Sequence, residues 1–330
     1  MSQVRRRQFL VAAGALLAVP LGAVAQSSRQ LPRIGYLSLA PLSEKPSPER
    51  MAFIEGLREL GYIDEQTIRI EYRSGEMNLE MLGDAAEALV ERKVDLIVAA
   101  GTVPALAAMK ATRTTPIVMM FSSEPVVAGL VRSLARPGGN ITGVSTIQTE
   151  VDQKRLALLK EAVPNISRVA VLWTSVHPSH AEELKAIERA ARTLRLSLRP
   201  FDVTEYSALQ AAFKRVTEER LDAILVMWDY RTLSYRSLIA DFALKHRLPT
   251  SMPSETFVRA GGLMSYAPNV NAIFRRSASY VDRILKGAKA ADLPIEEIST
   301  YRLIIDLRIA RELGIKVPQE LLYRADEVIR

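Results

Sequence analysis

The sequence of 330 residues contains no cysteine and only three histidines. The absence of cysteine excludes disulfides, Cys-ligated zinc, a thiol nucleophile and a lipid-anchored cysteine after an export signal. Aromatic residues make up 6% of the chain, and Lys and Arg form no long run with aromatic residues between them. Such a run is typical of nucleic-acid-binding proteins, so we expect no nucleic-acid partner.

The sequence also lacks the common catalytic motifs. It has no phosphate-binding G-x-x-x-x-G-K-[ST] loop, no dinucleotide-binding G-x-G-x-x-G turn and no G-x-S-x-G nucleophile elbow. His177 and His180 could ligate a metal, but no nearby acidic pair or cysteine completes a ligand set. We therefore interpret them as a solvated helix start, and Glu182 and Glu183 as part of an exposed helix face. No catalytic residue, cofactor or metal is predicted.

The N-terminus has the pattern of an export signal. The stretch "VRRRQFLVAAGALLAVPLGAVAQ" (4–26) has a basic start, an apolar segment and the small-residue ending Ala23-Val24-Ala25. The motif "RRQFL" resembles the twin-arginine signal, although ordinary secretion and a membrane anchor remain alternatives. We predict that residues 1–25 are a signal peptide, cleaved near Ala25, and that the mature protein is periplasmic. The formal net charge of +7 falls to +4 without this segment.

From residue 32 onward, strand and helix patterns alternate in two successive runs. Apolar runs of strand length indicate buried strands, and apolar residues at helical spacing indicate helices. This pattern predicts an α/β protein with two Rossmann-like lobes, each built on a parallel sheet. The predicted strands are 33–39, 67–73, 97–99, 116–121, 168–173, 196–203, 222–228, 248–253 and 301–307, and the predicted helices include 47–60, 79–93, 179–195, 207–219, 232–247 and 270–287.

Two segments are candidates for crossings between the lobes. "ARPGGNITGVS" (135–145) contains Pro and Gly residues that break regular structure, followed by an extended stretch, and "GGLMSYAPN" (261–269) has a similar character. Hinges need residues that absorb backbone rotation. We therefore expect a multi-strand hinge. The predicted lobes are 32–143 plus about 265–290, and 144–264 plus about 291–330.

Polar residues follow nearly every predicted strand. Because open parallel sheets bind ligands outside the carboxyl ends of their strands, these residues predict a shared cleft between the lobes. For each residue alone, capping of the following helix is the simpler interpretation. The candidates are Ser38, Thr102, Ser122, Ser123 and Glu124 in the first lobe, and Thr174, Asp229, Tyr230 and Ser254 in the second.

The order of segments resembles a known family, the solute-binding proteins of ABC transporters, in the group that includes tryptophan- and tyrosine-type binding proteins. The most specific pieces are "LARPGGNITG" and "AGGLMSYAPN". The resemblance implies a type I periplasmic-binding fold that closes over a small solute, a membrane permease as partner, and a monomer. By position, it places Ser38, Gly101, Thr102, Ser122, Ser123, Thr174, Asp229 and Ser254 along the cleft.

Three departures from the family pattern fall at the proposed site. Glu124 stands where an Asp usually precedes Pro-Val, "LWTSVHP" replaces a Leu-Trp-Asn-Pro pattern, and Tyr230 follows Asp229 in place of Pro. The family's ligand is therefore not transferred to this chain by resemblance.

The turn within "DLIVAAGTVPALAAMK" (95–110) is a candidate anion site. Gly101 allows a tight turn, Thr102 can cap the next helix, and Pro104 lies in its first turn. Backbone N–H groups at a helix N-terminus attract anions, so we hypothesise that the turn binds a carboxylate. A phosphate is disfavoured, because no Lys or Arg cluster accompanies the turn. Asp229 would then pair with an ammonium or hydroxyl group of the same solute.

Three aromatic residues lie near this site in the sequence. Trp173, Trp228 and Tyr230 could stack on a planar ligand or belong to the core, and the sequence leaves both readings open. The expected solute is amino-acid-like or an aromatic carboxylate. Two alternatives remain: a sensor that presents its ligand to a membrane receptor, and an enzyme that uses Glu124 and Asp229 as a carboxylate pair.

Overall fold

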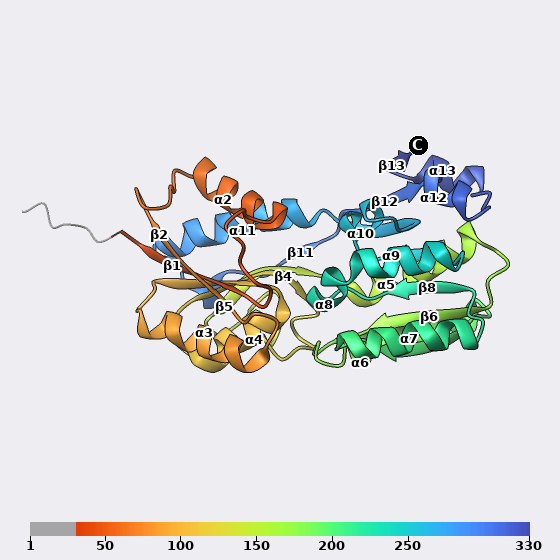
Figure 1. The fold of residues 1–330 in the computed structure, drawn as a ribbon. Helices are drawn as coiled ribbons and strands as arrows, with labels where there is room; N and C mark the ends of the chain where they lie inside the picture. The colour runs from red at the N-terminus through yellow and green to blue at the C-terminus, as the bar shows by residue number, and fades with distance from the viewer. Residues whose placement is uncertain (1–30) are drawn as a thin grey trace, which may run out of the picture. The chain divides into compact units, whose positions relative to one another are not determined.

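The computed structural model describes residues 31–330, and the predicted signal peptide at residues 1–25 lies outside them. The chain from Pro32 to Arg330 forms one compact unit. Within it are two β-sheets, each with helices on both faces (Figure 1). We call each sheet with its helices a lobe. None of the helices in residues 31–330 has the length and hydrophobicity needed to cross a membrane.

The first lobe is built on a six-stranded sheet in the order β11-β5-β4-β3-β1-β2, with every neighbouring pair parallel. Its strands are β1 (Arg33–Ser38), β2 (Arg69–Ser74), β3 (Leu96–Ala100), β4 (Ile117–Ser123), β5 (Ile141–Thr146) and β11 (Glu296–Ile298). Its helices are α2 (Pro48–Glu59), α3 (Leu79–Glu91), α4 (Thr102–Ala111), α11 (Val270–Leu285) and the 3₁₀ turn η1 (Ala290–Asp292).

The central strands of this sheet are buried on both faces, as continuous apolar runs require. Val98 of β3 packs in one core with residues of α2 and α11, whereas its neighbour Ile97 packs in the other core with residues of α3 and α4. Figure 1 shows α2 and α11 together on one side and α3 and α4 on the other. As predicted, α2 begins after Ser47, whose hydroxyl accepts a hydrogen bond from the N–H of Arg50.

The second lobe is built on a seven-stranded sheet in the order β13-β12-β10-β9-β8-β6-β7. Its strands are β6 (Arg168–Trp173), β7 (Ser197–Asp202), β8 (Ala223–Val226), β9 (Thr250–Met252), β10 (Met264–Pro268), β12 (Tyr301–Asp306) and β13 (Glu327–Ile329). Its helices are α5 (Gln148–Ala162), α6 (His180–Thr193), α7 (Tyr206–Glu218), α8 (Tyr230–Ser234), α9 (Arg236–Lys245), α10 (Glu255–Arg259), α12 (Leu307–Glu312) and α13 (Gln319–Arg324).

The predicted fold class, two α/β lobes with parallel sheets, is confirmed. One pair of strands departs from it, because β10 and β12 run antiparallel. This pairing follows from the chain path. After β10 the chain enters the first lobe as α11, and it returns to the second sheet as β12.

The chain passes between the lobes at three places. "NITGVS" ends within β5 of the first sheet, so the first crossing falls at Ile147 and the expected boundary at residue 143 lies inside a strand. The second crossing follows β10. The third follows β11, which pairs with β5, so residues 291–298 belong with the first sheet and not with the second lobe as expected.

Two helical predictions need correction. The sequence reading missed α5, because its buried face carries Gln148, Asp152 and Arg155 among the apolar residues and therefore hides the helical period. The segment 232–247 was expected to be one helix. It forms α8 and α9, which are separated at Tyr235.

Gly143 allows β5 to pass close to β4. Its φ is 135°, and a Cβ at this position would lie 2.1 Å from the carbonyl oxygen of Met119. Gly139 lies just before β5, but a Cβ there would meet nothing within 4 Å. The close approach at Gly143 therefore admits only glycine.

We predict that Gly143→Ala lowers the free energy of unfolding by about 2 kcal/mol or more, because two backbones would have to separate. The matched variant Gly139→Ala should stay within about 0.5 kcal/mol of the wild type. Thermal unfolding followed by circular dichroism measures both. Equal melting temperatures for the two variants would contradict the close packing of β4 on β5.

Candidate functional site

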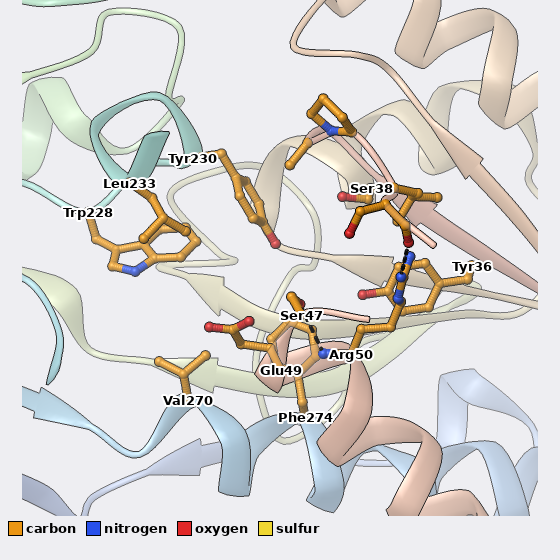
Figure 2. A pocket seen from close by; sticks show the side chains of 14 residues that line it. Tyr36, Ser38, Ser47, Glu49, Arg50, Trp228, Tyr230, Leu233, Val270 and Phe274 are labelled. Carbon is orange, nitrogen blue, oxygen red and sulfur yellow. Dashed lines mark hydrogen bonds between the residues drawn. The ribbon is translucent and has the colours of Figure 1, made fainter. Parts of the chain in front are cut away.

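A cavity of about 130 Å³ lies where the two lobes meet. Its lining comes from the end of β1, the loop before α2, the start of α2, the segment around α8 and the start of α11 (Figure 2). The two lobes therefore contribute opposite walls. We call this space the large cavity, to distinguish it from a smaller cavity between the same two lobes.

Aromatic rings dominate the walls of the large cavity. Tyr36 and Phe274 belong to the first lobe, and Trp228 and Tyr230 to the second. The Trp228 ring lies edge-on to Phe121 and to Tyr230, with ring centroids 4.7 and 5.1 Å apart. Flat apolar walls of this kind suit a solute with a flat apolar body.

The polar groups of the large cavity come mainly from the first lobe. Ser38, Ser43 and Ser47 supply hydroxyl groups, and Glu49 and Arg50 supply two charges. Arg50 is buried, donates a hydrogen bond to the carbonyl of Ser43, and has its guanidinium carbon 5.6 Å from the centroid of the Tyr72 ring. A few convergent polar groups in an apolar cavity are the usual composition of a small-molecule site.

Tyr230 connects the large cavity to the turn at Gly101. Its hydroxyl donates a 2.9 Å hydrogen bond to the carbonyl of Ala100, at the end of β3. Its ring covers Gly101 so closely that a Cβ there would lie 3.4 Å from the ring. Burial raises the pKa of the Tyr230 hydroxyl well above its usual range. The second lobe thus covers one side of the turn that the sequence analysis proposed as an anion site.

The prediction that Thr102 caps α4 is wrong. Gly101 occupies the capping position with φ of 107°, and no side chain caps this helix. The Thr102 hydroxyl instead accepts a 3.0 Å hydrogen bond from the N–H of Ser123 and contacts the Ser122 hydroxyl at 3.2 Å. Thr102 therefore fixes the end of β4.

A second, much smaller cavity of about 10 Å³ lies beside this strand end. That volume is about one water molecule. It is lined by Thr102, Phe121, Ser123, Thr146, Gln148, His177, His180, Glu183 and Trp228. Trp228 lines both cavities.

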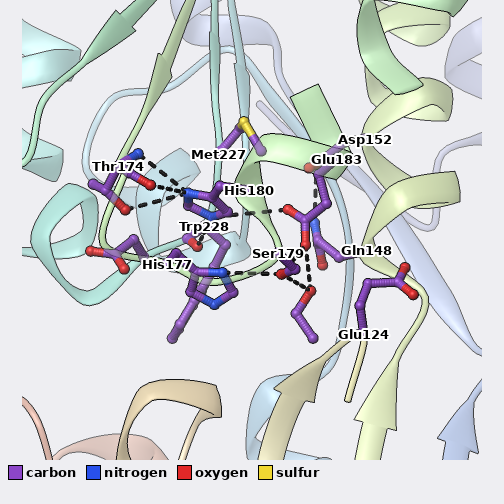
Figure 3. A network of polar contacts seen from close by, with 12 residues as sticks. Glu124, Gln148, Asp152, Thr174, His177, Ser179, His180, Glu183, Met227 and Trp228 are labelled. Atoms are coloured by element: carbon purple, nitrogen blue, oxygen red, sulfur yellow. Dashed lines mark hydrogen bonds and ion pairs between the residues drawn. The ribbon is translucent and has the colours of Figure 1, made fainter. Parts of the chain in front are cut away.

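A hydrogen-bond network at the small cavity joins the lobes. One carboxylate oxygen of Glu183, on α6 in the second lobe, accepts a 2.6 Å hydrogen bond from the hydroxyl of Ser123 in the first lobe (Figure 3). The same oxygen accepts a second 2.6 Å bond from Ser179. Glu183 is fully buried, so the expectation of an exposed helix face is wrong for this residue, whereas Glu182 is exposed as expected.

The two histidines beside Glu183 are also buried, which corrects their interpretation as a solvated helix start. Their rings stack with centroids 4.2 Å apart. The Nδ1 of His180 lies 3.2 Å from the N–H of Thr174 and 3.0 Å from its carbonyl, and Nε2 lies 3.1 Å from the carbonyl of Trp228, to which a protonated Nε2 donates. Burial, and then the charge of His180, lower the pKa of His177 well below its usual range. No metal-binding group of three ligands occurs in residues 31–330.

Behind Glu183 lies a second buried pair, Asp152 and Arg155 on α5. Arg155 also donates to the carbonyls of Val226 and Ser251, at distances of 2.6 and 2.7 Å. Each acid keeps one buried oxygen without a hydrogen-bond partner. Burial raises the pKa of Glu183, and the charge of Asp152 adds to this effect, whereas His180 and the two hydroxyl groups oppose it.

The remaining predicted site residues lie outside both cavities. Glu124 accepts a hydrogen bond from the N–H of Thr149 at 3.1 Å, and Asp229 forms a capping box at the start of α8. Ser254 occupies the capping position of α10, and Trp173 packs against the core of the second lobe. Neither Glu124 nor Asp229 lines the large or the small cavity.

Sequence reasoning missed Glu49, Arg50 and Phe274 in the large cavity, and Glu183 in the network. Glu49 and Arg50 read as ordinary first-turn residues of a helix, and no sequence signal distinguishes them. The sequence does contain a signal for the burial of Glu183. It lies four residues before Ile187 and next to Leu184, so helical spacing places it on the apolar face of α6.

The burial of Glu183 predicts a pH-dependent stability. A carboxyl whose pKa is raised in the folded state stabilises the fold below its unfolded pKa, and this contribution is lost as the pH rises through the folded value. Glu183→Gln keeps an oxygen that can accept both hydroxyl bonds and removes the charge. We expect it to raise the melting temperature by about 2–4 °C near pH 8, with the difference vanishing near pH 4.5.

Thermal unfolding from acidic to alkaline pH measures this difference. Glu182→Gln is the matched control, since Glu182 is exposed and paired with Lys185. Because the pKa of His177 is lowered in the folded protein, acidification destabilises the fold. Wild type and both variants keep this histidine, so each variant is compared with the wild type at the same pH. A Glu183→Gln protein less stable than wild type near pH 8 would show that the ionised carboxylate stabilises the fold.

Comparisons with known proteins identify the family of the chain. A family model described as "ABC transporter substrate binding protein" matches residues 45–329. The "Tyrosine-binding protein" of Clostridioides difficile (strain R20291) is 25% identical over 272 residues, which are 82% of this chain and 78% of that protein.

Two solved structures are similar over 91% of this chain and all of theirs. One is an ABC domain from Streptococcus pneumonia in complex with L-Trp, with 28% identity and a TM-score of 0.84. The other is a conserved domain protein from Vibrio cholerae, with 24% identity and a TM-score of 0.85.

Proposed function

Because the chain belongs to the family of ABC transporter substrate-binding proteins, we propose that it captures a small solute in the large cavity and delivers it to a membrane permease. One observation carries this proposal: the walls of the cavity come from both lobes. A solute bound there contacts both lobes at once and stabilises the arrangement in which they meet. Such a ligand-dependent arrangement is what a permease can distinguish.

The proposed solute is amino-acid-like or an aromatic carboxylate. The rings of Tyr36, Trp228, Tyr230 and Phe274 would contact its flat body, and the Ser38 hydroxyl would bind a polar group. The related proteins named for tyrosine and solved with L-Trp support this class. Of the residues proposed from the sequence, Ser38 and Tyr230 line the large cavity, and Thr102 and Ser123 line the small one.

The proposed action is binding without turnover, outside the cytoplasm. ABC transporter substrate-binding proteins present solutes to their permeases from the extracytoplasmic side, which agrees with the export signal predicted at residues 1–25. We propose a periplasmic monomer that needs no cofactor. A role as a ligand sensor for a membrane receptor would use the same cavity.

Native mass spectrometry of the mature protein, purified without refolding, tests the proposal. We expect a small-molecule adduct that is lost on denaturation, and its mass identifies the solute. Isothermal titration with L-tryptophan and L-tyrosine then measures affinity directly. A protein without adduct that binds neither amino acid nor any aromatic acid would contradict the proposed solute class.

Trp228 gives a residue-level prediction. Because its ring lines both cavities, Trp228→Ala should weaken binding of the identified solute about tenfold to a hundredfold. Tyr323→Ala removes an aromatic side chain that is 80% exposed, and it should bind like the wild type. Titration calorimetry measures both. Equal affinities for wild type and Trp228→Ala would place the solute elsewhere.

A further inference from the structure

The large cavity contains one carboxylate, Glu49, that forms no ion pair with any residue from 31 to 330. Glu49 lies in the first turn of α2, and the two other carboxylates of this helix, Glu55 and Glu59, both pair with Arg275. By contrast, no Lys, Arg or His nitrogen in residues 31–330 lies within 4.0 Å of the Glu49 carboxylate. The charge of Glu49 is therefore available to a ligand.

Arg50, the next residue, does not pair with Glu49. Its guanidinium is held by the Ser43 carbonyl and the Tyr72 ring. In Figure 2 this guanidinium lies beside Tyr36, whereas the Glu49 carboxylate points toward Trp228 and Val270. The two charges thus face different parts of the cavity.

The Glu49 charge acts inside the cavity. Burial raises the pKa of Tyr36 and of Tyr230. At Tyr36 the charge of Arg50 opposes this rise and the Glu49 carboxylate adds to it, and at Tyr230 the Glu49 carboxylate also adds to it. The part of the wall toward which the Glu49 carboxylate points is apolar, with Trp228 and Val270. A negative charge in such surroundings interacts more strongly with an incoming group than it would in water.

A solute that fills the cavity removes water from Glu49. An uncharged or anionic solute gives the carboxylate nothing in return, and an unpaired buried charge is costly. A solute with a protonated nitrogen replaces the lost water with a charge-assisted hydrogen bond. The same nitrogen can lie against aromatic rings, which attract cations.

We propose that Glu49 is a specificity-determining residue that selects solutes carrying a positively charged nitrogen next to a flat apolar body. The inference rests on the proposed function, in which the large cavity is the solute site. It names the ammonium group as required and makes the solute carboxylate dispensable. Aromatic amines are then ligands as well as amino acids, whereas aromatic carboxylates without an amine are excluded.

Three indole probes that differ in charge test this selection by titration calorimetry: tryptamine, L-tryptophan and indole-3-propionate. We expect wild-type protein to bind the two amines at least about tenfold more tightly than the acid. In Glu49→Gln this preference should fall to about threefold or less, whereas Glu49→Asp keeps the charge and should keep the direction of the preference.

Glu44→Gln is the matched control, because it removes a charge from an exposed residue in the same segment. It should bind the three probes as the wild type does, and melting temperatures confirm that each variant is folded. Equal binding of tryptamine and indole-3-propionate by the wild type would overturn the inference and leave the proposed function intact. A preference for amines that persists in Glu49→Gln would also overturn the inference and leave the proposed function intact. Failure of all three probes would overturn the proposed solute class, and the inference with it.

Discussion

A fully buried carboxylate, Glu183, accepts hydrogen bonds from both lobes, and the arrangement of the cleft depends on it. Its two donors are held in place by neighbours: Thr102 accepts the N–H of Ser123, and Ser179 contacts His177 Nδ1 at 3.1 Å. A carboxylate removed from water needs such partners, since an unsatisfied one destabilises the fold by several kcal/mol at ~25 °C. Separation of the lobes would remove the Ser123 hydroxyl from Glu183. The surroundings of the buried Glu183 carboxylate in the second lobe therefore depend on where the first lobe places Ser123.

Trp228 links this contact to the solute site. Its carbonyl lies within hydrogen-bond distance of Nε2 of His180, one turn before Glu183, while its ring lines the large cavity. Two residues later, Tyr230 binds the carbonyl of Ala100 and covers Gly101. The short segment after β8 thus makes an interlobe bond and supplies two aromatic walls. A solute that displaces either ring acts on the same segment that holds the lobes together.

The sequence predicted the fold well, because continuous apolar strands and amphipathic helices leave a strong periodic signal. Helix α5 was missed where that signal fails, since Asp152 and Arg155 are buried as a pair and read as surface residues. The candidate site was harder to predict. Strand-end positions located the cleft, yet Glu124 and Asp229 cap helices, and Thr102 holds β4. Whether a polar residue faces a ligand, a helix end or a neighbouring strand depends on tertiary contacts that no local pattern contains.

The two glutamates of the cleft show why residue type alone does not assign a role. Glu183 is fully buried and satisfied on one oxygen by two hydroxyl groups, so its surroundings stabilise the contact between lobes. Glu49 is half-buried beside aromatic rings and forms no ion pair within residues 31–330, which is why we propose that its charge serves a ligand. The difference lies in the partners that the fold provides. A charge in the cavity wall can therefore act on a ligand even though none of the strand-end positions carries it.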